Sequence, residues 1–156
     1  MAAKRPSGSR RGLTSKEQMA WRALVRALIV APHVLDADLL DASGLNMADY
    51  HVLVVLSEHP EHAMRMTELA DRATYTPSGV SRVVERLSRR GMVTRVRSEV
   101  DGRGQVAQLT DAGYEALLAT YPSHLRSVRT RVMRHLRGVD LEAFAAAMNA
   151  IADETI

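Results

Sequence analysis

The stretch from residue 67 to residue 110 constrains the fold of this chain most, because several local signals follow one another there in a fixed order. The first apolar pattern predicts a short helix, which we expect Thr67 to cap. Its apolar positions are Leu69, Ala70 and Ala73. The pattern breaks at residues 74–75 and restarts at Thr76, a capping hydroxyl, followed by Pro77 at the first helical position. The stretch therefore begins with two helices joined by a tight turn.

The second predicted helix has one apolar face and one polar face. Its apolar residues recur at the spacing of one helix face and are Val80, Val83, Val84 and Leu87. The polar face begins with small residues and one arginine, namely Ser78, Gly79, Ser81 and Arg82. Serine can read donors or acceptors on base edges, arginine favours guanine, and small side chains let the backbone come close. We therefore predict that this helix, which Gly91 ends, enters a DNA major groove as the second helix of a helix-turn-helix does.

A β-hairpin is predicted after this helix by two valine-rich runs, at residues 92–97 and 105–109. Arg103 lies between two glycines at its tip and is expected to enter a minor groove, with Asp101 placed to hold the guanidinium. A short extended piece at residues 63–66 is placed to pair with the hairpin as a third strand. Five further residues are expected to lie along the DNA, mostly as phosphate contacts: Thr67, Thr74, Thr76, Pro77 and Arg86.

Three runs of the sequence resemble the winged helix-turn-helix of MarR-family transcription regulators: TELADRATYTPSGVSRVVERLSRRGMV, DGRG and LTDAGYEAL. Residues 101–104 match the family's D-x-R-G wing signature, and the resemblance is strongest over about residues 49–118. It implies a mainly α fold with a winged helix-turn-helix at about 47–110, flanked by dimerisation helices at about 14–42 and 111–154. It also implies a homodimer that reads a pseudo-palindromic operator in double-stranded DNA, with repression as the family default.

The resemblance further implies a small-molecule effector, because MarR-like proteins bind small anionic aromatic or phenolic ligands between the dimer helices and the DNA-binding lobe. A subgroup that responds to urate-like ligands uses a tryptophan of the first helix. The residues that would lie near such a site here are Trp21, Arg22, Tyr50 and His51. For Trp21, and for the single phenylalanine Phe144, core packing is the alternative interpretation.

The flanking helices have their own start and stop signals. Thr14-x-x-Glu17 is a capping box that opens the first long helix, and Pro32 should kink or interrupt it. The acids of its second half, Asp36, Asp38 and Asp41, are expected to face water. Asn46 caps the next helix, and Thr110 caps the long helix after the hairpin. That helix should bend at Pro122 and end at Gly138, with a last helix from about Asp140.

The apolar stripes of these terminal helices are too long for one small lobe to cover. Exposed stripes of this kind mark interaction surfaces, and a two-fold homodimer through the first and last two helices is the simplest closure. Such a dimer would place two recognition helices about one DNA turn apart.

Length and composition bound the class of protein. With 156 residues we expect one domain, at 14–156, after a disordered basic arm at 1–13 that is either a solvated tail or a source of phosphate attraction. Cysteine is absent, which excludes disulfides, thiolate metal sites and cysteine redox sensing. Without a membrane-length apolar run or a signal peptide, a cytoplasmic location is expected.

The net charge of +3 is unevenly distributed along the chain. Residues 65–104 hold nine basic and five acidic residues, whereas residues 17–64 hold two basic and seven acidic ones. A basic segment that coincides with the helix-turn-helix suits a polyanionic partner.

Catalytic and metal-binding patterns are weak by comparison. His59 and His62 lie in one turn, but too few further ligands converge there to predict a metal, and we expect no cofactor. No nucleophile elbow or phosphate-binding glycine loop is visible, so an enzyme is not expected. Two alternatives to the regulator interpretation remain: a winged-helix protein-interaction module, and an architectural DNA-binding protein without an effector.

Overall fold

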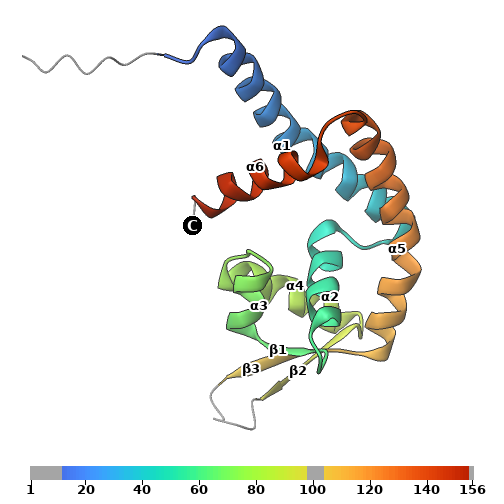
Figure 1. Cartoon of the computed structure of the whole chain (residues 1–156). Helices are drawn as coiled ribbons and strands as arrows, with labels where there is room; N and C mark the ends of the chain where they lie inside the picture. The colour runs from blue at the N-terminus through green and yellow to red at the C-terminus, as the bar shows by residue number, and fades with distance from the viewer. Residues whose placement is uncertain (1–11, 98–103, 155–156) are drawn as a thin grey trace, which may run out of the picture.

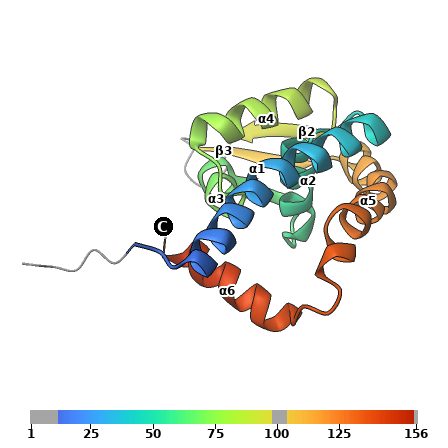
Figure 2. The ribbon, with the colours of Figure 1, turned by 90° about the horizontal axis from the view of Figure 1, so that it is seen from above.

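The computed structural model describes residues 12–97 and 104–154 and is mainly helical, with one small sheet. In chain order the elements are α1 (Ser15–Ser43), α2 (Met47–Glu58), β1 (Ala63–Arg65), α3 (Met66–Arg72), α4 (Pro77–Arg89), β2 (Val93–Arg97), β3 (Gln105–Leu109), α5 (Asp111–Arg131), the 3₁₀ helix η1 (Met133–Leu136) and α6 (Leu141–Asp153). Helices α2, α3 and α4 and the sheet form one lobe, which we call the winged lobe, while α5 leads from it to the end where α1 and α6 lie (Figure 1). Seen from above, α6 stands away from the winged lobe (Figure 2).

Polar side chains begin most helices at the predicted residues. Thr14 and Glu17 form the reciprocal capping box, in which the Thr14 amide donates to Glu17 Oε2 at 2.7 Å. The side chains of Asn46, Thr76, Thr110 and Asp140 cap α2, α4, α5 and α6 by accepting from backbone amides. Gly44 adopts φ 68°, the left-handed conformation that lets α1 end and the chain turn into α2.

The sheet has the order β1-β3-β2, and both pairs are antiparallel. In this register Ala107 lies opposite both Met64 and Arg95, at the centre of the sheet. The predicted third strand is therefore confirmed, and the sheet connects the end of α2 to the start of α5.

The hydrophobic core lies in the winged lobe and is built around α4. All four predicted apolar residues of α4 are buried, and they belong to one cluster with residues of α2 and α3 such as Leu53, Leu56 and Leu69. Each such side chain contributes about 1.5–3 kcal/mol by leaving water. Because one face of α4 is anchored in this way, its opposite face points outward.

Several sequence-based expectations are wrong at helix ends. Thr67 does not cap α3, because strand β1 leads directly into the helix and Arg65 is the residue before its first turn. Helix α5 ends at Arg131 instead of reaching Gly138, and the chain tightens into η1, as helix C-termini often do. Pro32 does not interrupt α1, and α5 runs through Pro122 as one helix, as expected. Each proline removes one backbone donor, but the packing of α1 against α5 keeps both helices continuous.

Two of the acids expected to face water instead join elements. Asp36 Oδ1 accepts from the Met47 amide at 2.7 Å, which ties α1 to the first turn of α2. Asp38 binds Arg131 through two hydrogen bonds of 2.9 Å and accepts a third from the Ser127 hydroxyl. These bonds, with the Arg131 guanidinium first, hold the pKa of Asp38 at about 2.

Trp21 and Phe144 are not core residues of the protomer, since their exposed fractions are 56% and 40%. None of the described residues of α6 is buried. Among the described residues, no helix is long and apolar enough to cross a membrane.

Candidate nucleic-acid interface

The first turns of α4 present small polar groups to solvent. Ser78 and Arg82 are exposed, and Thr76 is both exposed and the N-cap. The Thr76 hydroxyl accepts from the Gly79 amide at 3.1 Å and lies 3.3 Å from the Ser78 hydroxyl. A Cβ at Gly79 would lie 3.0 Å from Thr76 Oγ1, so the absence of a side chain there keeps this cap close to the helix. The surface is a capped helix N-terminus with two exposed hydroxyls, a suitable arrangement for phosphate oxygens and base edges.

Arg82 is the exposed cation of this surface that the sequence singled out. Its Nε donates to the Ser78 carbonyl at 3.3 Å, so the side chain lies back along the helix towards its N-terminus. No carboxylate within salt-bridge distance of Arg82 is found in the described chain, unlike Arg89, which pairs with Glu85 at 2.9 Å. Among the described residues the other donors of the Arg82 guanidinium therefore have no hydrogen-bond acceptor, and they lie next to the small residues at the start of α4.

Arg86 has a contact that the sequence did not predict. Its Nη2 and Nε lie 2.6 and 2.8 Å from Oδ1 of Asp49, a carboxylate only 2% exposed in the first turn of α2. Arg90 lies 4.0 Å from the same carboxylate and donates to the Gly44 carbonyl at 2.9 Å. These pairs fasten the second half of α4 to the junction of α1 and α2, which orients the helix. The predicted phosphate contact of Arg86 would have to be made by a side chain that already holds Asp49.

Arg95 was missed by sequence reasoning. Its Nη2 donates to the Ser81 carbonyl at 2.7 Å and to the Ser81 hydroxyl at 3.0 Å, and so joins strand β2 to α4. In a strand, alternate residues share a face, and Arg95 shares the face of the buried Val93. An arginine at a core-facing position of a strand could have indicated this contact from the sequence, because a charged side chain there needs a polar partner.

The remaining predicted DNA-binding residues divide into two groups. Thr67, Thr74 and Pro77 are exposed on the winged lobe. Thr74 has φ 56° in the turn between α3 and α4, and Pro77 is the first residue of α4. Asp101 and Arg103 lie outside the described residues.

A large apolar groove lies between α1, the end of α5 with η1, and α6. Its volume is about 1020 Å³, and its lining includes Trp21, Leu24, Val30, Leu136, Phe144 and Met148. Further apolar side chains along α1, among them Leu28 and Ile29, are also exposed. Continuous apolar surfaces of this kind are rare on monomers and mark interaction sites.

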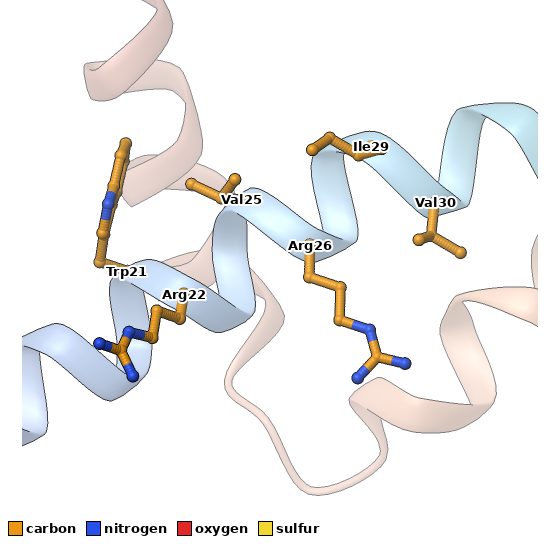
Figure 3. Close-up of a pocket in the computed structure, with 6 residues that line it drawn as sticks. All are labelled: Trp21, Arg22, Val25, Arg26, Ile29 and Val30. Atoms are coloured by element: carbon orange, nitrogen blue, oxygen red, sulfur yellow. The ribbon is translucent and has the colours of Figure 1, made fainter.

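The four predicted effector residues do not form one site in a single protomer. Trp21 and Arg22 line a smaller hollow of about 330 Å³, whose six lining residues all come from α1 (Figure 3). Tyr50 instead packs on His124 of α5, with ring centroids 4.6 Å apart, and His51 meets Tyr75 edge-on at 5.8 Å. Burial raises the pKa of Tyr50, so its hydroxyl stays neutral at physiological pH.

No group of three or more metal-ligating side chains is found in the part of the chain that the structure describes. His59 Nδ1 instead accepts from the Glu61 amide at 3.3 Å, and the ring of His62 contacts Tyr114.

Comparison with known proteins identifies the family to which this chain belongs. The model of the MarR family matches residues 43–104, the stretch from the end of α1 to the start of β3. Sco3205 of Streptomyces coelicolor, a MarR family transcriptional regulator whose structure was solved in complex with DNA, is 38% identical with a TM-score of 0.87. The alignment covers 92% of this chain and 91% of Sco3205. The chain belongs to the MarR family.

Two further relatives agree with this assignment. AbsC, another MarR family transcriptional regulator of Streptomyces coelicolor, is 36% identical with a TM-score of 0.85, over 93% of this chain and 97% of AbsC. The transcriptional repressor MdtR of Bacillus subtilis (strain 168) is 28% identical over 123 residues, which are 72% of this chain and 76% of MdtR. The chain spans about half the length of several other curated relatives it matches. These relatives are transcription regulators, which places this MarR-family chain among regulators and not enzymes.

Proposed function

We propose that this MarR-family chain is a homodimeric, cytoplasmic repressor that binds a pseudo-palindromic operator in double-stranded DNA. The observation that carries the proposal is the outward face of α4. This face joins a capped helix N-terminus, small hydroxyls and Arg82, which has no carboxylate partner among the described residues, while the opposite face of the helix is buried in the core. The relative Sco3205, with 38% identity, was crystallised in complex with DNA.

The first turns of α4 are proposed to lie in the major groove. Ser78, Ser81 and Arg82 would face base edges, while Thr67, Thr74 and Thr76 would lie near phosphates. On sequence grounds the proposal includes a minor-groove contact by Arg103 with Asp101 beside it.

The homodimer is supported by the groove between α1 and α6. This groove has a volume of about 1020 Å³ and mostly apolar walls, and none of the described residues of α6 beside it is buried. A second copy of the chain would remove this apolar surface from water. Two-fold symmetry would then supply two copies of α4 to successive major grooves.

An effector is proposed to act at α1. Trp21 offers an aromatic face, and Arg22 and Arg26 in successive turns offer two guanidinium groups that favour an anion (Figure 3). The hollow is bounded by one helix only, so it would gain a second wall in the dimer. A small aromatic carboxylate or phenolate would release the repressor if it binds more tightly to a dimer arrangement that cannot bind DNA. Tyr50 and His51 would then shift together with α2, on which they lie.

Binding of the purified protein to its own upstream DNA and to random DNA, titrated over salt concentration, tests the central proposal. We expect selective binding whose affinity falls steeply with salt, because neutralised phosphates release counterions. Equal affinity for all DNA would point to an architectural role. An absence of binding at low salt would refute the DNA-binding proposal and leave a protein-interaction module.

Arg82→Ala, with Arg89→Ala as a matched control on the same helix, tests the base-reading role. Arg82→Ala should lose roughly 1–3 kcal/mol of discrimination at one base pair of each half-site. Arg89, which pairs with Glu85 in the last turn, should leave discrimination intact. Equal discrimination by Arg82→Ala and the unsubstituted protein would show that Arg82 does not read a base.

A further inference from the structure

Arg95 and Ser81 form a contact between the strand that leads to the wing and the helix proposed to read DNA. One nitrogen, Nη2 of Arg95, donates to both the carbonyl and the hydroxyl oxygen of Ser81, at 2.7 and 3.0 Å. The two residues are 14 positions apart in sequence and lie on different elements. The contact therefore depends on how β2 packs against α4.

The rest of the Arg95 side chain shows that its position is fixed. Its Nε is buried and has no hydrogen-bond partner among the described residues. A buried donor without a partner costs free energy, so the other contacts of this side chain must hold it in place. Here the neighbours are the sheet, where Arg95 lies opposite the buried Ala107, and α4 with Ser81. The guanidinium is therefore packed between the sheet and the side of α4, and these contacts restrict its rotamers.

This contact limits what the Ser81 hydroxyl can offer to a ligand. A serine hydroxyl has one donor and two acceptor lone pairs, so a free serine accommodates either kind of partner. In this structure one lone pair accepts from Arg95, and the positive guanidinium 3.0 Å away disfavours the approach of any further N–H donor. Within the described chain the Ser81 O–H meets no acceptor and remains available, and Ser81 is half-buried in the second turn of α4, at the edge of the outward face.

We propose that Arg95 is a positioning residue that turns Ser81 into a hydrogen-bond donor and so sets a preference for an acceptor atom on the facing DNA base. This inference rests on the proposed DNA-binding function and deepens it. The acceptors available in a major groove are guanine O6 and N7, adenine N7 and thymine O4, whereas cytosine offers an amino donor. At the position facing Ser81, the protein disfavours cytosine.

The test begins with selection of preferred duplexes from a random DNA pool by the unsubstituted protein. Duplexes that carry single base-pair changes are then titrated with Ser81→Ala, Arg95→Met and the double variant. We expect both single variants to flatten discrimination at the same one base pair by about three- to tenfold, the range of a single net hydrogen bond. The double variant should flatten it no further, since the two residues act as one unit.

Thr94→Ala, at an exposed neighbouring position of β2, is the matched control and should change no base preference. Thermal denaturation of each variant shows whether it is folded. If Arg95→Met does not fold, Arg95→Lys takes its place. Lysine keeps the charge but lacks the rigid planar group, so it should lose part of the discrimination.

Three outcomes would overturn the inference. If Ser81→Ala leaves every base preference unchanged, Ser81 reads no base. A uniform loss of affinity by Arg95→Met for all sequences, with a salt slope reduced by about one, would make Arg95 a phosphate contact instead. If the unsubstituted protein selects no sequence at all, the proposed function itself fails, and this inference fails with it.

Discussion

Asp49 is a charged side chain removed almost entirely from water, at 2% exposure, and its partner Arg86 is 40% exposed. The two partners of this pair differ in how well they can do without each other. An unpaired arginine at this position can turn towards solvent, whereas an unpaired buried carboxylate cannot. The pair therefore stabilises the fold less than its short distances suggest, but it fixes the direction of α4 relative to α2.

This asymmetry predicts unequal effects of removing either partner. Asp49→Asn keeps the shape and should lower the free energy of unfolding by about 2 kcal/mol, as for a lost hydrogen bond to a charged group. Arg86→Ala leaves the buried carboxylate with only the more distant Arg90, at 4.0 Å, and should cost more, about 3–5 kcal/mol. The double variant should be more stable than Arg86→Ala alone. Denaturant unfolding of the three variants checks this order, and a double variant less stable than both single ones would contradict it.

His124 is a second polar residue held by packing. Its ring lies against Tyr50, its Nδ1 is buried without a hydrogen-bond partner in the described chain, and burial lowers its pKa. In the unfolded chain this histidine binds a proton near pH 6.5, whereas in the folded protein it binds one only at a lower pH. Stability from the neutral imidazole is present above this pH and is lost as the pH falls below it.

We accordingly expect the melting temperature to fall between pH 7.5 and pH 5.5, and to fall less in His124→Phe, which keeps the ring but cannot titrate. His33→Gln, at an exposed position of α1, serves as the control and should behave as the unsubstituted protein does. The same pH dependence in His124→Phe and the unsubstituted protein would refute the role of His124.

At the scale of elements, α5 approaches the turn before β2 so closely that only a glycine fits at the contact. A Cβ built at Gly113, in the first turn of α5, would lie 2.1 Å from the Met92 carbonyl oxygen and 2.8 Å from Leu109 Cδ1. Backbone cannot move aside as a side chain can. The same turn is tied by the Thr110 amide, which donates to the Met92 carbonyl at 3.1 Å. This contact sets where α5 leaves the winged lobe.

Gly113→Ala should therefore destabilise the protein by at least about 1–3 kcal/mol, the usual cost of overpacking. Ala112→Ser, at the exposed position next to it, is the control and should change stability by less than about 0.5 kcal/mol. Thermal or denaturant unfolding measures both, and an unchanged Gly113→Ala protein would mean that α5 can shift away from the sheet.

The elements also show which features of the fold can be predicted from sequence. The caps at Thr14, Asn46 and Thr76 were predictable, because a cap depends on residues three positions away at most. Thr67 was wrong because the pairing of β1 with β3 decides where α3 starts, and that pairing spans more than 40 residues. The outward face of α4 followed from its apolar period. The contacts of Asp49 with Arg86 and of Arg95 with Ser81 did not, since they depend on tertiary packing.

At the scale of the whole molecule, burial is distributed unevenly. The core cluster draws mainly on the winged lobe and the residues next to it, with Leu39 from α1 and Leu117 from α5. The first half of α1 and the described part of α6 contain no fully buried residue, although their sequences carry apolar stripes. A single copy of the chain thus leaves the apolar groove between α1 and α6 in water, and a two-fold dimer would bury this groove in both copies.

Phe144→Asp tests this arrangement. Phe144 lines the groove and is 40% exposed, so the variant should fold as a monomer, whereas we expect the unsubstituted protein to be a dimer. Ala146→Asp adds the same charge on the opposite side of α6, about 200° around the helix by its period of 3.6 residues, and should remain a dimer. Sedimentation velocity over a concentration series measures the mass, and circular dichroism checks the helix content. Loss of the dimer should also weaken operator binding steeply, because one protomer reaches only one half-site. A monomeric unsubstituted protein, or a Phe144→Asp protein as dimeric as the control, would show that this groove is not the interface between two copies.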